Sequence, residues 1–144
     1  MTFQLVEPIL LIGLGGVGAR LAEKAKKSLN SDCLLISHDQ KDLTIENSIK
    51  ISTKSVVNPS THLIRGSTLE TSDEIKKNIA NYSTVILMSN LAGKAGTGIG
   101  PIVSRICKQE QKNLLSFVVM PFKFEKERIF QSGIALKRIR QDSQ

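Results

Sequence analysis

The chain has 144 residues, of which 40% are hydrophobic and 23% are charged, and its net charge at pH 7 is +7. This length suits one domain, and the composition is close to that of average globular proteins, which excludes disordered and fibrous classes. The longest apolar run, residues 8–14, is far shorter than the roughly 20 residues of a membrane-spanning helix. Because the N-terminus also lacks the features of a signal peptide, we expect a cytoplasmic protein with no transmembrane segment.

The remaining composition argues against two kinds of site. The basic residues are scattered, and one Tyr and no Trp are available for base stacking, so specific nucleic-acid binding is not expected. Cys33 and Cys107 lie in apolar surroundings without C-x-x-C spacing, which is typical of buried thiols. Neither His38 nor His62 completes a metal-ligand pattern with them, so no metal site is expected.

The first half of the chain alternates apolar runs with turn signals. Residues 8–13 form a continuous apolar run that ends in glycines, and residues 17–29 have apolar positions at helical spacing. Residues 33–37 predict a second strand, closed by His38 and Asp39, and residues 49–52 predict a weak edge strand. We expect the sequence Asn-Pro-Ser at 58–60 to form a loop.

The second half repeats the strand, loop and helix order. A helix is predicted over 72–81, and a strand over 84–88 leads into a small-residue loop at 89–98 and a further helix. A strand over 114–120 precedes a basic helix over 126–140. This alternation predicts an α/β fold, a doubly wound, Rossmann-like three-layer sandwich with a mostly parallel sheet.

The first glycine loop is typical of phosphate binding. Gly13, Gly15 and Gly18 form G-x-G-x-x-G between a strand and a helix, where backbone N–H groups can approach phosphate oxygens. The same pattern also fits an NAD or FAD domain with Asp39, 21 residues after Gly18, on the ribose. A third reading is that the glycines only permit a tight turn and close helix packing.

The second glycine loop is more simply explained as a second phosphate cradle, because a dinucleotide fold does not require it. Gly96 and Gly98 would allow a second phosphate cradle, in which the Thr97 hydroxyl donates to a phosphate or positions a Mg²⁺-bound water. The alternative interpretation of residues 89–98 is a simple turn that leads into a helix. Because both loops follow parallel strands, we expect them to share one crevice at the carboxyl edge of the sheet.

Three blocks, in this order, resemble the FtsZ/tubulin family. Residues 13–20, GLGGVGAR, resemble its first phosphate loop, and residues 92–98, AGKAGTG, are similar to its GGGTGTG signature. Residues 117–125, FVVMPFKFE, resemble the FtsZ pattern V-V-x-x-P-F-x-F-E-G-x-x-R, which is uncommon outside the family. The resemblance implies a guanine-nucleotide-binding domain linked to cell division or a cytoskeletal filament system, with GTP or GDP as ligand, alone or with Mg²⁺.

The resemblance also implies the positions that contact nucleotide. Asp39 falls where FtsZ has the Asp of N-T-D, Asn58 falls in the γ-phosphate loop, and Glu125 and Arg128 match the pair near ribose and guanine. No catalytic residue and no metal ligand is implied. The implied nucleotide-binding residues are Gly13, Gly15, Gly16, Gly18, Arg20, Asp39, Asn58, Gly93, Lys94, Ala95, Gly96, Thr97, Gly98, Pro121, Glu125 and Arg128.

The chain departs from the family pattern inside these motifs. Lys94 and Ala95 replace a Gly and a Thr of the signature, and Arg20 replaces the Asn of the first loop. Two readings of Lys94 stay open, an ammonium that binds phosphate as a point charge and a solvated side chain on a reshaped loop. The γ-phosphate loop at 55–59 also lacks the family's run of glycine and alanine.

The resemblance ends near Gln144, before the guanine-reading segment, the central helix and the second domain with its acidic catalytic loop. We therefore expect residues 1–144 to form an incomplete nucleotide-binding domain that does not hydrolyse GTP efficiently alone. Expected partners are guanine nucleotide and FtsZ-like subunits or other division proteins. Two alternatives stay open, a non-catalytic FtsZ-like scaffold or regulator with weak nucleotide binding, and an NAD- or ATP-binding Rossmann protein.

Overall fold

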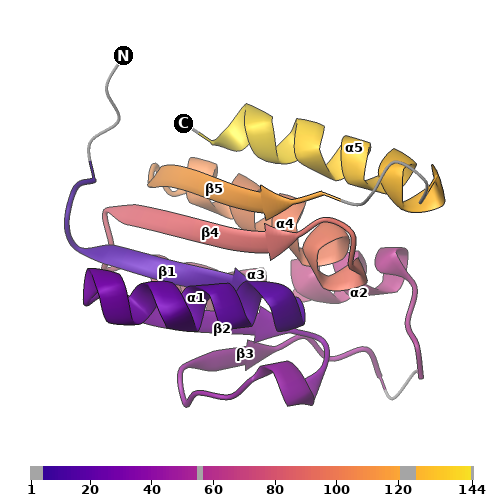
Figure 1. Ribbon diagram of the computed structural model, residues 1–144, viewed down its shortest axis with the longest axis horizontal. Helices are drawn as coiled ribbons and strands as arrows, with labels where there is room; N and C mark the ends of the chain where they lie inside the picture. The colour runs from indigo at the N-terminus through magenta and orange to yellow at the C-terminus, as the bar shows by residue number, and fades with distance from the viewer. Residues whose placement is uncertain (1–4, 55–56, 121–125, 144) are drawn as a thin grey trace.

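The computed structural model describes residues 5–54, 57–120 and 126–143, with side chains from Ser132 onward in the last range. Five strands in these residues form a parallel sheet in the order β3-β2-β1-β4-β5 (Figure 1). The chain runs outward from β1 on both sides, which is the doubly wound arrangement and confirms the predicted fold class. The strands are β1 (Ile9–Leu14), β2 (Asp32–Ser37), β3 (Ser48–Lys50), β4 (Thr84–Asn90) and β5 (Asn113–Val119).

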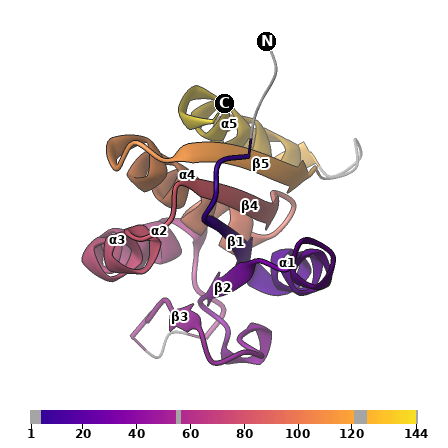
Figure 2. The same cartoon turned by 90° about the vertical axis from the view of Figure 1, so that its left-hand side faces the viewer.

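Helices cover both faces of the sheet, which gives three layers when the molecule is viewed along the strands (Figure 2). One face carries α1, and the other carries α4 with α2, α3 and α5 packed around it. A short 3-10 helix, η1, follows β2. The helices are α1 (Gly15–Leu29), η1 (Gln40–Asp42), α2 (Thr61–Glu70), α3 (Ser72–Ile79), α4 (Lys94–Gln109) and α5 (Lys126–Asp142).

The apolar runs form central strands because both of their faces are buried. In β1, Leu10 and Ile12 belong to the core beneath α4, and Leu11 belongs to the core beneath α1. None of these three side chains is exposed to solvent. Continuous apolar runs of this kind are typical of parallel strands covered on both sides, and they leave polar chemistry to the ends of the strands.

Two segments differ from the sequence predictions. Residues 61–70, which had no predicted element, form α2, with Ser60 as an N-cap that accepts a hydrogen bond from the N–H of Leu63 at 3.2 Å. The predicted loop at 89–98 is much shorter, because β4 extends to Asn90 and α4 begins at Lys94. The second glycine motif therefore forms the first turn of a helix.

The cysteines are buried thiols, as predicted. Burial raises the pKa of Cys107 to about 12 and also raises the pKa of Cys33.

In the described ranges, no group of three or more His, Cys, Asp or Glu side chains could hold a metal ion. No described helix is long and apolar enough to cross a membrane.

Leu114 tests the packing of this core. Its side chain is completely buried in β5 between the sheet and the helices on the α4 face, so Leu114→Ala should lower the free energy of unfolding by about 2–5 kcal/mol. Phe117→Ala, three residues along the same strand where the side chain is 53% exposed, is the matched control and should cost much less. Urea unfolding followed by circular dichroism measures both changes, and equal losses would contradict the assigned core.

Candidate functional site

A cavity of about 370 Å³ lies at the carboxyl ends of β1 and β4, the point where the strand order reverses direction. Ligands of doubly wound sheets bind at this place. The ends of the two strands, the first turns of α1 and α4, and the segment after β2 all contribute to its wall. The lining residues are Leu14, Gly15, Gly16, Val17, Arg20, His38, Asp39, Asp42, Asn90, Gly93, Lys94, Ala95 and Gly96.

The two helices that begin at this cavity have no side-chain caps. The N-cap residues are Leu14 for α1 and Gly93 for α4, neither helix has a capping hydrogen bond from a side chain, and neither has an acidic residue in its first turn. By contrast, α2 is capped by Ser60, and α3 carries Asp73 and Glu74 in its first turn. The first N–H groups of a helix have no intrahelical partner, so α1 and α4 both present donors to the cavity.

These donors belong to residues that line the cavity. Each helix contributes the backbone N–H groups of its first three residues, and all of these residues line the cavity. The partial positive charge of each helix N-terminus adds to their attraction for an anion. The six residues are Gly15, Gly16, Val17, Lys94, Ala95 and Gly96.

The glycines next to the cavity allow the two first turns to approach the sheet and each other. Gly15 has φ +69°, a conformation that side chains rarely adopt, and a Cβ on it would lie 2.8 Å from the Cβ of Ala95. A Cβ on Gly96 would lie 2.1 Å from the carbonyl oxygen of Asn90. The cavity therefore depends on close backbone contacts at these two positions.

Other residues of the two motifs pack helices instead of lining the cavity. A Cβ on Gly13 would lie 2.5 Å from the carbonyl oxygen of Gly18, and one on Gly18 would lie 2.4 Å from that of Met88. Gly98 faces the side chain of Ile64 in α2, where a Cβ would lie 2.8 Å from a methyl carbon. These glycines bring α1 close to the sheet and α2 close to α4.

The Thr97 hydroxyl bonds to the backbone of its own helix. It donates to the carbonyl oxygen of Gly93 at 3.1 Å and to that of Lys94 at 3.3 Å, and the residue is 5% exposed. Thr97 does not line the cavity in the described structure. Its predicted contact with a phosphate or a Mg²⁺-bound water stays a prediction, and would require the hydroxyl to leave these carbonyls.

The charged side chains at the cavity are two cations and two carboxylates. The cations are Arg20 and Lys94, and the carboxylates are Asp39 and Asp42. The carboxylates are already engaged, since Asp39 accepts from the N–H of Lys41 at 3.0 Å and Asp42 accepts from the Ser37 hydroxyl at 2.7 Å. These bonds fix the segment after β2.

His38 contributes an imidazole ring to this segment. Burial lowers its pKa, and the nearby Lys94 lowers it further, although Asp39 and Asp42 act in the opposite direction. Its Nδ1 atom is buried and has no hydrogen-bond partner among the described residues. The lowered pKa favours the neutral form of the imidazole.

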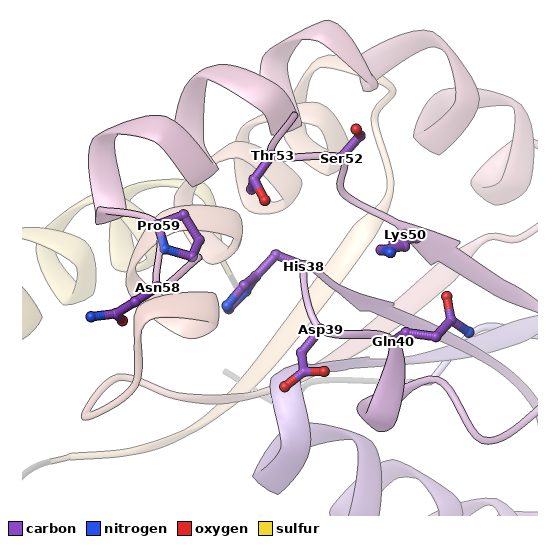
Figure 3. A pocket seen from close by; sticks show the side chains of 8 residues that line it. All are labelled: His38, Asp39, Gln40, Lys50, Ser52, Thr53, Asn58 and Pro59. Carbon is purple, nitrogen blue, oxygen red and sulfur yellow. The ribbon is translucent and has the colours of Figure 1, made fainter. Parts of the chain in front are cut away.

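A second, polar cavity of about 590 Å³ adjoins the first and shares His38 and Asp39 with it. Figure 3 shows the imidazole of His38 turned toward Asn58 and Pro59, with Lys50 farther along the wall. The loop before α2 thus forms one side of this cavity. Its link to the first cavity is Lys94, whose Nζ donates to the Asn58 side-chain oxygen at 2.6 Å.

The structure brings about half of the predicted site residues to one cavity. Asn58 lines the adjoining cavity, whereas Gly13, Gly18, Thr97 and Gly98 line neither. Pro121 and Glu125 lie outside the described residues, as does the side chain of Arg128. The predicted residues that line the first cavity are Gly15, Gly16, Arg20, Asp39, Gly93, Lys94, Ala95 and Gly96.

Three polar lining residues were not predicted. His38 directly follows β2, Asp42 is the last residue of η1, and Asn90 is the last residue of β4. Asn90 accepts a hydrogen bond from the N–H of Ala92 at 3.0 Å through its side chain, which shapes the short loop before α4. For His38 and Asn90 the available signal was their position, because polar residues at the carboxyl ends of buried parallel strands lie at the ligand-binding edge. Asp42 lies in η1 and gave no such signal.

The order of the strands defines a doubly wound α/β domain. The cavity lies between β1 and β4, where domains of this class bind ligands. The sequence matches the Tubulin/FtsZ family, GTPase domain, over residues 8–144. The chain belongs to this family, and the resemblance predicted from its motifs is confirmed.

Individual relatives agree with this assignment. Cell division protein FtsZ 2 of Halobacterium salinarum is 25% identical over 92% of this chain, and FtsZ of Mycoplasmopsis pulmonis is 34% identical over 49%. The structure of an FtsZ dimer from M. jannaschii is 25% identical and superposes with a TM-score of 0.83 over 94% of this chain. This chain spans 36% of the Halobacterium protein, 19% of the Mycoplasmopsis protein and 42% of the M. jannaschii chain.

The close contact at Gly96 can be tested without any ligand. Gly96→Ala should lower the free energy of unfolding by about 1–3 kcal/mol, because its Cβ would collide with the backbone of Asn90. Gly93→Ala is the matched control. A Cβ there would lie 3.7 Å from the same carbonyl oxygen, an ordinary contact, and the loss should stay within about 1 kcal/mol. Thermal unfolding measures both, and a Gly96→Ala protein as stable as wild type would refute this packing.

Proposed function

We propose that this chain binds a guanine nucleotide, with its phosphates at the N-termini of α1 and α4, as part of a cell-division or cytoskeletal filament system. One observation carries the proposal: two uncapped helix N-termini meet at one cavity at the carboxyl edge of the sheet. Membership of a GTPase-domain family supports the choice of a guanine nucleotide.

The geometry suits a chain of phosphates better than a single anion. Donors come from both sides of the cavity, from α1 on β1 and from α4 on β4, so adjacent phosphates can each receive N–H groups. Arg20 supplies a guanidinium, a group well matched to phosphate oxygens. The carboxylates of Asp39 and Asp42 oppose anion binding, so we expect modest affinity.

Magnesium would arrive with the nucleotide. The described residues offer no metal cluster of their own, but Mg²⁺ is commonly held by one or two carboxylates together with substrate phosphates. Asp39 and Asp42 are the lining residues with this chemistry. The ion would neutralise phosphate charge and so offset the repulsion from these two carboxylates.

Base recognition and hydrolysis are separate parts of the proposal. We assign Glu125 and Arg128 to the base and ribose side, and count Pro121 among the nucleotide-binding residues, by their match to the family motif. For hydrolysis, both carboxylates at the cavity already accept hydrogen bonds, Asp39 from the N–H of Lys41 and Asp42 from the hydroxyl of Ser37, so we assign neither as a general base. We therefore propose slow turnover by residues 1–144 alone and association with like subunits, as in the M. jannaschii FtsZ dimer.

A second candidate is an FtsZ-like scaffold or regulator that binds nucleotide weakly. The observation that favours it is the charge balance of the cavity, where two carboxylates offset two cations, one of which is already hydrogen-bonded to the loop before α2. The two candidates differ in affinity, so direct titration separates them.

Isothermal titration calorimetry with GTP, GDP, ATP and NAD, each with Mg²⁺, tests the proposal. Guanine nucleotides should bind most tightly, with a dissociation constant on the order of micromolar, equivalent to about 8 kcal/mol. Arg20→Glu should weaken binding at least about tenfold, whereas Lys24→Glu, one turn along the exposed side of the same helix, should change it by less than about threefold. A preference for NAD would contradict the proposal, and the absence of binding at millimolar GTP would favour the scaffold.

A further inference from the structure

Lys94 connects two parts of the site that are far apart in sequence. It is the first residue of α4, and its Nζ donates to the side-chain oxygen of Asn58 at 2.6 Å and to the carbonyl oxygen of Pro59 at 2.9 Å. Asn58 has φ 53°, a left-handed conformation that asparagine tolerates better than most residues. The ammonium thus holds a tightly turned segment of the loop before α2.

The ammonium lies where the two cavities adjoin. Lys94 lines the 370 Å³ cavity, while both of its acceptors, Asn58 and Pro59, line the 590 Å³ cavity. Figure 3 shows these acceptors on the side of the second cavity that faces His38. A phosphate that extends beyond the two helix N-termini toward this boundary would meet Lys94.

The charge of Lys94 is not neutralised within the described structure. Its acceptors are an amide oxygen and a backbone carbonyl oxygen, and no described carboxylate lies within ion-pair distance of it. An ammonium has three N–H donors, and two of them are used here. One donor and the full positive charge are therefore available to a ligand without breaking the contacts with the loop.

We propose that Lys94 determines specificity for a nucleoside triphosphate over a diphosphate, because it clamps the Asn58–Pro59 segment and presents its third donor to the terminal phosphate. This inference rests on the proposed nucleotide-binding function. A third phosphate needs positive charge and room beyond the amide groups of α1 and α4, and the boundary between the cavities provides both. The bound triphosphate in turn fixes Lys94, and through it the loop before α2.

Two variants separate the charge from the clamp. Lys94→Met removes the charge and both hydrogen bonds but keeps an unbranched apolar side chain. Asn58→Gly removes the side-chain oxygen that accepts from Lys94 and leaves the ammonium in place. Glycine adopts the positive φ of this position without strain. Lys24→Met, on the exposed surface of α1 away from both cavities, is the control for loss of one positive charge.

Affinities for GTP and GDP with Mg²⁺ provide the test. Lys94→Met should lower GTP affinity about tenfold and GDP affinity by less than about threefold, since one charge-assisted hydrogen bond corresponds to roughly a tenfold change. Lys24→Met should retain the wild-type ratio of the two affinities, whereas Asn58→Gly, which loosens the clamp but keeps the ammonium, should lower this ratio by less than Lys94→Met does. In the nucleotide-free proteins, amide hydrogen exchange at residues 57–63 should accelerate in Lys94→Met and Asn58→Gly only.

The outcomes distinguish this inference from the proposed function. If wild type and Lys94→Met bind GTP and GDP with the same ratio, nucleotide binding stands and the role of Lys94 is refuted. If exchange accelerates but the ratio is unchanged, Lys94 is only a structural tether, which also overturns the inference. If wild type binds neither nucleotide, the proposed function fails and the inference falls with it.

Discussion

The close approach of two helices to the end of one strand is the constraint on which this domain depends. The carbonyl oxygen of Met88 lies 2.4 Å from the position that a Cβ of Gly18 would take, and that of Asn90 lies 2.1 Å from the position that a Cβ of Gly96 would take. Because both oxygens belong to β4, the first turns of α1 and α4 are drawn to the same edge of the sheet. Their free N–H groups converge as a result, and the cavity is the space between them.

This constraint divides the glycines of each motif into two functions. Gly13 and Gly18 allow helix packing, whereas Gly15 and Gly16 expose backbone donors at the cavity. The contacts of Gly13 and Gly18 agree with the reading in which the glycines serve packing, whereas phosphate binding at Gly15 and Gly16 stays a prediction. In the second motif, Gly96 does both, since it contacts the strand and also lines the cavity.

The sequence predicted the sheet well because buried parallel strands are continuous apolar runs bounded by turn residues. It did not predict α2, whose buried side chains are Ile64, Ser67 and Thr68. Two of these three are polar, and Thr68 is satisfied by donating to the carbonyl oxygen of Ile64 at 2.7 Å. Helical periodicity in hydrophobicity was therefore too weak to detect.

The candidate site was predicted from the sequence only in part, for a different reason. The glycine motifs located the two helix starts that border the cavity, because their spacing reflects local backbone geometry. The contact between Lys94 and Asn58 joins residues 36 positions apart, so the sequence left open whether this lysine was solvated or bound. The structure shows a third arrangement, in which the ammonium is engaged by the loop and still borders the cavity.

The central claim is that nucleotide phosphates bind at the N-termini of α1 and α4. The most direct test is to record amide chemical shifts of the isotope-labelled 15.8 kDa protein by NMR during addition of GDP with Mg²⁺. The account predicts that the largest shifts occur at residues 15–17 and 94–96, where unpaired N–H groups would bond to phosphate oxygens. Largest shifts on the exposed basic surface of α1, with residues 94–96 unaffected, would contradict it.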